Sequence, residues 1–491
     1  MSALHPHQKQ ELAELAVIAM RERGLQPEFP QPALEQLQTI DGPSDERGTG
    51  IADMTGLPWC SIDNDDSRDL DQLSASEILP NGDVRILVAV ADVDTLVRAH
   101  TPIDQHAEVN TTSVYTSARI FPMLPERLST DFTSLNPQQT RVALVTEMDF
   151  APDGTLRQSR ITRARVHNQA KLAYDAVAAW LEGTGPLPPA AAAVPGMDQQ
   201  LRTQDSVAQQ LRARRREHGS LEFQTLQPRA EFDGDRVVAI RQQVQNRARQ
   251  LIEEFMVATN GVVARYLASQ QRASLRRVVR SPERWARIAE VAAERGTTLP
   301  PDPDSAALEQ FLAAERRRDP ERFPDLSLTI VKLMGRGEYV AEVPGGPRMG
   351  HFGLAVRDYS HSTAPNRRFP DLITSRLVKA ALAGAKAPYS HAELDRLAVH
   401  CTRQEDAANK VERQLRKSEA AMLLEQRIGD VFDGVVTGVS KGNNWVRVFS
   451  PPAEGKLVIG RGRAVQVGNK VRAKLLSTNV ERGFIDFELV V

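Results

Sequence analysis

Aspartates crowd one short stretch of this chain, at Asp63, Asp65, Asp66, Asp69 and Asp71. Ionised carboxylates this close together repel one another unless water or a cation offsets the repulsion. The stretch follows the apolar segment LPWCSI and precedes sequence typical of a sheet, so we expect it to lie against a core rather than in a solvated loop. Mg²⁺ prefers a few carboxylate ligands and keeps water and phosphate as the others, as phosphodiester hydrolysis requires. Asp63, Asp69 and Asp71 could provide such a site.

Two other kinds of metal site are disfavoured. A calcium loop of the EF-hand type that began at Asp63 would need Gly and Glu where the chain has Arg68 and Ser74. Cys60 and Cys401 are the only cysteines and are far apart in the sequence, which supports neither a disulfide framework nor a zinc ribbon. Any metal is therefore expected on oxygen ligands.

Composition places the chain among ordinary globular proteins of two or three domains, with 491 residues of which 41% are hydrophobic. The sequence shows neither an apolar run long enough to cross a membrane nor the apolar core of a signal peptide, so we expect a cytoplasmic protein without membrane contact. The net charge of −1 would argue against a polyanionic partner, but residues 427–491 carry more Lys and Arg than Asp and Glu. A nucleic-acid site could therefore be local.

The pattern of apolar residues predicts an α+β fold in three parts. Residues 1–48 hold two short helices, near 8–24 and 32–39, that could form either a helix-turn-helix module or a helical cap on the main domain. Residues 49–426 begin with a mainly antiparallel sheet over 51–166, whose turns lie at Asn81-Gly82 and Asp153-Gly154. An exposed loop is expected over 184–196 and further strands within 221–241. Helices are expected over 246–270, 282–295, 370–385 and 391–427.

In residues 427–491 the helical pattern gives way to five short β-rich runs separated by Gly and Asn turns. This pattern predicts a small five-stranded barrel.

The acidic stretch IDNDDSRDLDQ resembles the aspartate motif D-x5-D-x-D-D of the ribonuclease II/R (RNB) family. Asp63, Asp69 and Asp71 match three of its four aspartates, and Gln72 stands at the fourth position. The resemblance implies a metal site made of these four residues, in which a neutral amide replaces one carboxylate.

Further segments resemble the family in the same order along the chain. Tyr115 and the following FPMLP are similar to the family's tyrosine segment, and LSTDFTSL continues the match. HFGLAVRDYSHSTAPNRRFPDL, residues 351–372, is similar to the signature HFGL…TSPIRRY.D, with Arg367 and Arg368 retained and Asn366 in place of an aliphatic residue. Phe223, in REHGSLEF, stands at the second aromatic clamp, and Glu412 near a late glutamate.

The resemblance implies an RNB catalytic domain, an antiparallel sheet surrounded by helices, followed by an S1-type OB-fold barrel. It also implies a hydrolytic 3′ to 5′ exoribonuclease that uses Mg²⁺, or Mn²⁺, to degrade single-stranded RNA to nucleoside 5′-monophosphates. No obligate protein partner is expected. Two cold-shock barrels usually precede the catalytic domain in this family, whereas about fifty residues do so here, which suggests a more open channel that could admit partly paired RNA.

Each site residue has an expected role. Arg367 would bind phosphate with its planar guanidinium, although a structural ion pair with Asp371 or another carboxylate is an alternative. Tyr115 and Phe223 would stack on bases. Arg368 and Glu412 are weaker RNA-binding candidates. Contacts from the barrel are expected from the aromatic residues Phe432, Trp445 and Phe449, of which only one or two would reach RNA, and from Lys441, Arg447 and Lys456.

Two rival interpretations remain open. The chain could be an RNA-binding protein of the same fold that has lost catalysis, because Gln72 occupies an aspartate position. It could also be a helix-turn-helix regulator with an inert body.

Overall fold

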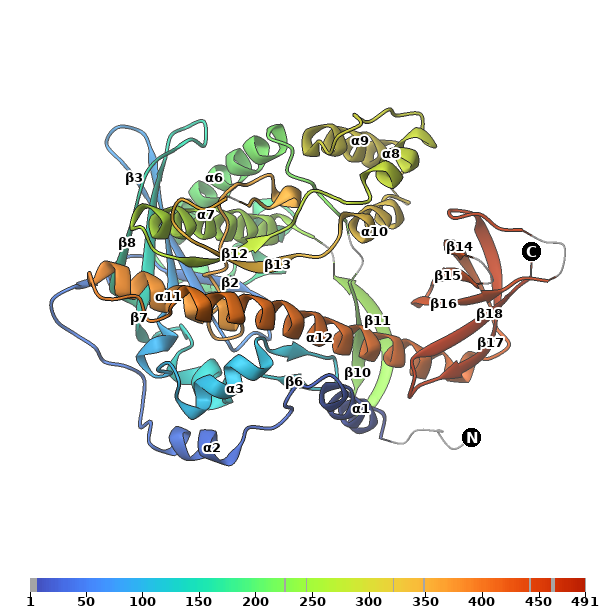
Figure 1. The fold of residues 1–491 in the computed structure, drawn as a ribbon, viewed down its shortest axis with the longest axis horizontal. Helices are drawn as coiled ribbons and strands as arrows, with labels where there is room; N and C mark the ends of the chain where they lie inside the picture. Colours follow the sequence, from blue (N-terminus) through green and yellow to red (C-terminus); the bar gives the residue numbers. More distant parts are fainter. Residues whose placement is uncertain are drawn as a thin grey trace.

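The fold consists of a sheet surrounded by helices, with a small barrel at one end (Figure 1). It is seen in a computed structural model that describes residues 7–224, 227–243, 245–320, 322–347, 349–440, 443–460 and 464–490. The long helix α12 crosses the molecule from the sheet to the barrel, and the helices α8, α9 and α10 lie on the barrel side of the sheet.

The main sheet has seven strands in the order β1-β8-β7-β4-β3-β2-β9. Neighbours from β8 to β2 pair antiparallel, whereas β1 runs parallel to β8 and β9 runs parallel to β2. Gly82 and Gly154 take positive φ values, 84° and 77°, in the two predicted turns, a conformation that glycine adopts at no steric cost. The predicted mainly antiparallel sheet is confirmed. Its strands are β1 Ile51–Asp53, β2 Cys60–Asp63, β3 Gln72–Ile78, β4 Val84–Ala91, β7 Thr140–Phe150, β8 Leu156–His167 and β9 Ala170–Ala173.

Helices enclose this sheet and carry the segments that meet at its edge. α6 packs on β3, β4 and α7, and α7 in turn packs on β2, α4 and α11. The helices near the sheet are α3 Pro102–Asn110, α4 Tyr174–Leu181, α5 Pro189–Ala192, α6 Met197–Glu217, α7 Arg247–Ser269 and α11 Phe369–Leu382. Short paired strands connect them: β5 Val114–Tyr115 with β6 Ile120–Phe121, β10 Gln227–Asp233 with β11 Arg236–Gln243, and β12 Ser274–Val278 with β13 Glu338–Glu342.

α12, His391–Leu424, is the longest helix of the described chain. Ser390 and Glu393 form a capping box at its start, which satisfies free backbone N–H groups there. Its buried residues recur every three or four positions, so one stripe faces the core along its length. It packs on β13, on the β10-β11 hairpin and finally on the barrel strands β16, β17 and β18.

The helices α8 Trp285–Ala293, α9 Ser305–Arg318 and α10 Phe323–Met334, here called the helical triad, have a core of their own. Trp285, Phe311 and Phe323 are buried in it. Sequence periodicity predicted α8 but not α9 or α10.

The C-terminal strands close into a barrel in the order β14-β15-β16-β18-β17, as predicted. Phe432 and Phe487 fill its core, with ring centroids 6.1 Å apart. Gly483 lies in the turn that meets α12, and a Cβ atom there would lie 2.7 Å from the Cβ of Lys417. Glycine therefore permits this close approach. The strands are β14 Val431–Ser440, β15 Asn443–Phe449, β16 Pro452–Val458, β17 Lys470–Asn479 and β18 Phe484–Leu489.

The two N-terminal helices attach to different parts of the molecule. α1, Gln8–Glu22, packs along α12 and beside β11, whereas α2, Gln31–Gln38, packs on α3. This arrangement is that of a helical cap rather than of two helices packed on each other. The domain boundary at residue 48 stays a prediction.

The structure departs from the expected elements in two further places. The loop expected over 184–196 contains the short helix α5, whose Ala191 is fully buried and which packs on β9. The long helix α6 was not predicted. Among the described helices, none combines the length and the apolar character needed to cross a membrane.

Candidate active site

The acidic stretch joins β2 to β3 at one edge of the main sheet. Asp63 ends β2, and the backbone oxygen of Asp71 accepts a hydrogen bond from Ala91 N at 3.0 Å. Between them, Leu70 is buried, and its backbone bonds to Ser134 Oγ and Leu135 N at 2.9 Å each. The stretch is therefore held against the core, while Asp65 and Asp66 point to solvent.

Asp71 is the most buried aspartate of the stretch, with 2% of its surface exposed. One carboxylate oxygen accepts from Asn366 N at 2.9 Å, and the other accepts from Arg367 Nε at 3.2 Å. Burial raises the pKa of Asp71 to about 7, against the opposing effect of Arg367. Asn366, which departs from the family pattern, is fully buried, and its side chain accepts a hydrogen bond from Thr133 Oγ1.

The two neighbouring arginines have different partners. Arg367 faces Asp71 and keeps 41% of its side chain exposed. Arg368 donates from Nη2 to the fully buried Asp371 at 2.7 Å, and the same carboxylate oxygen accepts from Ala364 N at 2.8 Å. The ion pair with Asp371 that was considered for Arg367 is thus made by Arg368, whereas Arg367 pairs with another carboxylate, that of Asp71, and keeps part of its side chain exposed.

Tyr115 connects the aspartates to α12. Its hydroxyl donates to Asp69 Oδ2 at 3.1 Å, and its backbone N–H donates to Glu412 Oε1 at 3.0 Å. Burial raises the pKa of both Asp69 and Glu412 above the usual carboxyl value. The structure thus brings Tyr115, Asp69 and Glu412 together, although 297 positions separate Tyr115 from Glu412.

The aspartates suit a cation by their chemistry. All are hard oxygen donors. Burial is the main cause of the raised pKa of Asp69 and of Asp71, and a neighbouring carboxylate adds to it: Asp63 for Asp69, and Asp69 for Asp71. Arg367 lowers both pKa values but offsets only part of the rise, so a cation would relieve the remaining repulsion. Asp63 also accepts from Asn64 N at 2.7 Å and Ser67 Oγ at 2.9 Å. Within the described ranges, no group of three or more His, Cys, Asp or Glu is arranged to hold a metal ion. The metal set, including Gln72 at the start of β3, stays a prediction.

Tyr174 and Arg249 were missed by sequence reasoning. Tyr174 directly follows β9, whose Ala173 is in register with Asp63 of β2, so it lies at the same sheet edge. Arg249, on α7, lies 4.4 Å from the centre of the Tyr174 ring and donates to Asn64 Oδ1 at 2.8 Å. A parallel pairing of distant strands carries no local sequence signal, which is why neither residue was singled out.

Phe223 lies in the segment that joins α6 to β10. It is half-buried against the helical triad and lines a pocket of about 240 Å³ together with arginines of α6 and α9.

Some of the predicted barrel residues are exposed, whereas others lie in the core or form an ion pair. Trp445 and Phe449 are exposed, and Lys417 of α12 lies 5.9 Å from the Trp445 ring centre. Phe432 is a core residue. Arg447 pairs with Asp325 of α10 at 2.9 Å and so joins the barrel to the helical triad. Lys456 is exposed beside Trp445 in register, and Lys441 lies outside the described residues.

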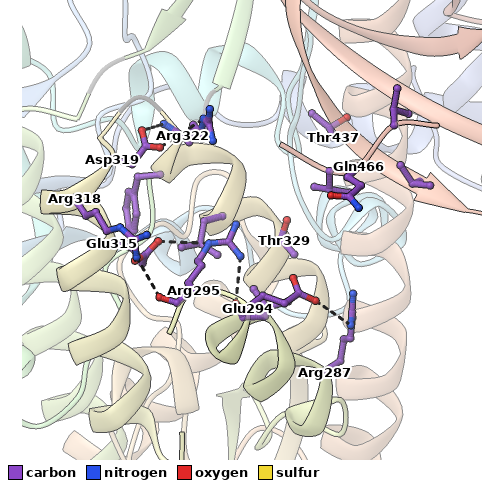
Figure 2. Close-up of a pocket in the computed structure, with 16 residues that line it drawn as sticks. Arg287, Glu294, Arg295, Glu315, Arg318, Asp319, Arg322, Thr329, Thr437 and Gln466 are labelled. Carbon is purple, nitrogen blue, oxygen red and sulfur yellow. Dashed lines mark hydrogen bonds and ion pairs between the residues drawn. The ribbon is translucent and has the colours of Figure 1, made fainter. Parts of the chain in front are cut away.

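A larger cavity, of about 830 Å³, separates the helical triad from the barrel (Figure 2). Of the predicted site residues that the structure describes, none lines it. Its arginines face carboxylates: Arg295 lies 3.5 Å and Arg318 3.1 Å from Glu315, and Arg287 lies 3.8 Å from Glu294. This cavity is therefore not where the chemistry-bearing residues gather.

Comparison with known proteins finds two domain families along the chain. Residues 51–384 match the RNB domain, and residues 430–490 match the RNase II-type exonuclease C-terminal S1 domain. Ribonuclease R of Escherichia coli is 30% identical over 96% of this chain and 62% of that protein, and ribonuclease R of Vibrio parahaemolyticus is 28% identical over 96% and 60%. The chain spans about three fifths of the length of these curated relatives. Ribonucleases with this domain generally depend on divalent metal ions.

Solved structures share the fold. Mycoplasma genitalium RNase R in complex with ribose-methylated single-stranded RNA has a TM-score of 0.88 and 21% identity, covering 98% of this chain and 78% of that one. Yeast Ssd1, described as a pseudonuclease, has a TM-score of 0.71 and 16% identity, covering 90% and 55%. At these identities the likeness establishes the fold alone, and that fold includes a protein without nuclease activity.

Proposed function

Because the chain belongs to the RNB family, we propose that it is a metal-dependent exoribonuclease that hydrolyses single-stranded RNA from the 3′ end and releases nucleoside 5′-monophosphates. One observation carries the proposal: Asp69 and Asp71 lie at one sheet edge with the accessible Arg367 and with Tyr115. Phosphodiester hydrolysis needs a negatively charged cation site beside a phosphate-binding group, and the aspartates and Arg367 at this edge support assigning these two roles to them. On this proposal the enzyme acts in the cytoplasm and needs no obligate protein partner.

The chain's own residues then divide the work. Arg367 binds the phosphate that is to be cleaved, since its guanidinium is permanently charged and accessible. Tyr115 stacks on a base near the 3′ end, and its contacts with Asp69 and Glu412 fix its position relative to the aspartates. Mg²⁺ or Mn²⁺ held by Asp63, Asp69, Asp71 and the Gln72 carbonyl would supply water activation and neutralisation of phosphate charge.

The rival proposal is an RNA-binding protein that has lost catalysis. Gln72 supports it, because an amide replaces a carboxylate, and a pseudonuclease of the same fold is known. The retention of the other three aspartates favours activity, because a protein that only binds RNA has no use for buried carboxylates that repel one another.

A degradation assay separates the two proposals. The full chain is incubated with 5′-labelled single-stranded RNA in Mg²⁺ or in EDTA, beside Asp71→Asn as control. The proposal predicts labelled products that shorten progressively in Mg²⁺ with the unaltered chain alone. Binding without degradation would support the rival, and equal degradation by Asp71→Asn would indicate a contaminating nuclease.

A further inference from the structure

Three guanidinium groups converge on one carboxylate in the pocket beside Phe223. Glu222 faces Arg212 and Arg216 of α6 and Arg316 of α9. Arg316 also donates from Nη2 to the backbone oxygen of Glu222 at 2.7 Å, and Arg216 Nε lies 4.0 Å from the carboxylate. Guanidinium groups that gather in this way bind carboxylates and phosphates through the same donor geometry.

The other carboxylates near the pocket lie beside only two of these three arginines or face a fourth one, Arg215. Glu253 and Glu254 both face Arg215, at 3.5 Å and 2.6 Å. Glu309 lies 3.9 Å from both Arg216 and Arg316, and burial raises its pKa to about 7, which lowers its charge near neutral pH. Glu222 is therefore the carboxylate that lies against all three of these arginines.

The pocket is open to a ligand. It encloses about 240 Å³, and Arg216 keeps 43% of its side chain exposed. Phe223, the next residue after Glu222, lines the same pocket, so an aromatic ring and several guanidinium groups line one pocket. Single-stranded nucleic acids are bound by this combination of aromatic surface and basic groove.

α7 connects this pocket to the candidate active site. Gln250 accepts a hydrogen bond from Arg212 Nη1 at 2.6 Å, and the preceding residue, Arg249, reaches Asn64 beside Asp63. An RNA strand that ends at the aspartates could therefore continue along the first turns of α7 to the arginines.

We infer that Arg212, Arg216 and Arg316 form a subsite for a backbone phosphate of the RNA, and that Glu222 is the resident anion which this phosphate replaces. The inference rests on the proposed function, because the ligand is the same RNA. The Glu222 carboxylate then competes with the RNA phosphate for the three arginines, and this competition weakens RNA binding.

The test measures binding rather than degradation. A fluorescently labelled single-stranded oligoadenylate is titrated with the full chain in EDTA, over a series of salt concentrations. Glu222→Gln should bind about threefold to tenfold more tightly, since a competing charge is removed. Arg216→Ala should bind about threefold to tenfold more weakly, and the slope of log affinity against log salt should become shallower by about 0.7, the value of one phosphate contact on a single strand.

Arg214→Ala is the matched control. Arg214 lies on the same helix with 38% of its side chain exposed, but it faces Asp153 at 3.5 Å rather than the pocket. Its removal should leave the affinity and the salt slope unchanged. A purely structural role for Glu222 predicts that Glu222→Gln lowers the unfolding temperature and binds RNA equally or more weakly; either binding result overturns the inference.

Equal effects of Arg216→Ala and Arg214→Ala would overturn it as well. If the unaltered chain degrades RNA while these results contradict the subsite, only this inference fails. If the unaltered chain does not bind RNA, both the inference and the proposed function fail.

Discussion

The candidate active site gathers carboxylates, whereas the pocket of Arg212, Arg216 and Arg316, here called the arginine pocket, gathers guanidinium groups. At the sheet edge, Asp69 and Asp71 share one accessible guanidinium, that of Arg367. In the pocket, three guanidiniums share the carboxylate of Glu222. Partly buried charge without balancing partners is costly, so a fold that retains it is suited to a ligand of the opposite sign. The comparison suggests a cation at the first region and a phosphate at the second.

The two regions also differ in how firmly their key carboxylate is held. Asp71 is almost fully buried and is fixed by a backbone N–H and by Arg367. Glu222 is less buried and lies in a segment without regular secondary structure. A fixed carboxylate suits a permanent ligand, whereas a less constrained one suits an anion that is replaced when RNA binds.

The largest effect is expected at the sheet edge, from Asp71→Asn. The rate of RNA degradation should fall on the order of 10³-fold, the scale for loss of a fixed charge at a reacting centre. Affinity for RNA in EDTA should be retained, because Asp71 repels phosphate. Single-turnover rates and titrations check the two quantities, and a parallel loss of both would remove the distinction between the regions.

Arg367→Lys should lower the rate about 10²-fold, since an ammonium group cannot reproduce the forked contact to phosphate. Arg368→Lys is the comparison, because Arg368 is paired with the buried Asp371. The main effect of Arg368→Lys should be a lower free energy of unfolding, with a smaller loss of rate per folded molecule than in Arg367→Lys. Urea denaturation beside the rate assay measures both, and equal rate losses in the two variants would contradict the assignment.

Tyr115→Ala should weaken RNA binding by about 1–3 kcal/mol, the contribution of one base stacked on an aromatic ring. Tyr115→Phe retains the ring and removes only the hydrogen bond to Asp69, so its affinity should stay close to that of the unaltered chain. Fluorescence titration with a short oligonucleotide compares the three proteins. Similar losses in both variants would show that the hydroxyl, rather than stacking, is what matters.

The smallest effect concerns Glu309 beside the arginine pocket. Its pKa is raised from 4.5 to about 7 by burial, so the unfolded chain releases this proton at lower pH than the folded protein does. The free energy of unfolding should therefore fall between about pH 4.5 and 7, and Glu309→Gln should reduce that fall by about 1–3 kcal/mol. Urea denaturation at pH 4.5 and 7.5 tests it; identical pH dependence in both proteins would refute the assigned shift.

Local patterns in the sequence predicted the parts that depend on local chemistry. Gly82 and Gly154 marked the turns of the sheet, and the apolar stripe of α12 marked its longest helix. α6 was missed because its buried face includes polar residues: Gln204 accepts from Ser74 Oγ, and Gln200 accepts from Ser76 N. A helix that packs through hydrogen bonds lacks the apolar period on which such predictions rely.

The site was predicted in its residue types but not in its pairings. The three aspartates, Tyr115 and Arg367 were singled out, but the ion pairs Arg368–Asp371 and Arg447–Asp325 were not. Tyr174 reaches the site through the parallel pairing of β9 with β2, and Glu222 gains its arginines from two helices. Contacts of this kind depend on tertiary structure and leave no trace in residue spacing.

Hydrolysis from the 3′ end is best tested through the identity of the first product. Single-stranded RNA labelled on its 3′-terminal nucleotide is incubated with the full chain in Mg²⁺, and the label is followed by chromatography from the earliest times. The account predicts that the label leaves at once as a nucleoside 5′-monophosphate, with no labelled fragment of intermediate length. Label that remains in oligonucleotides while the RNA shortens, or that leaves as a nucleoside 3′-phosphate, would contradict it.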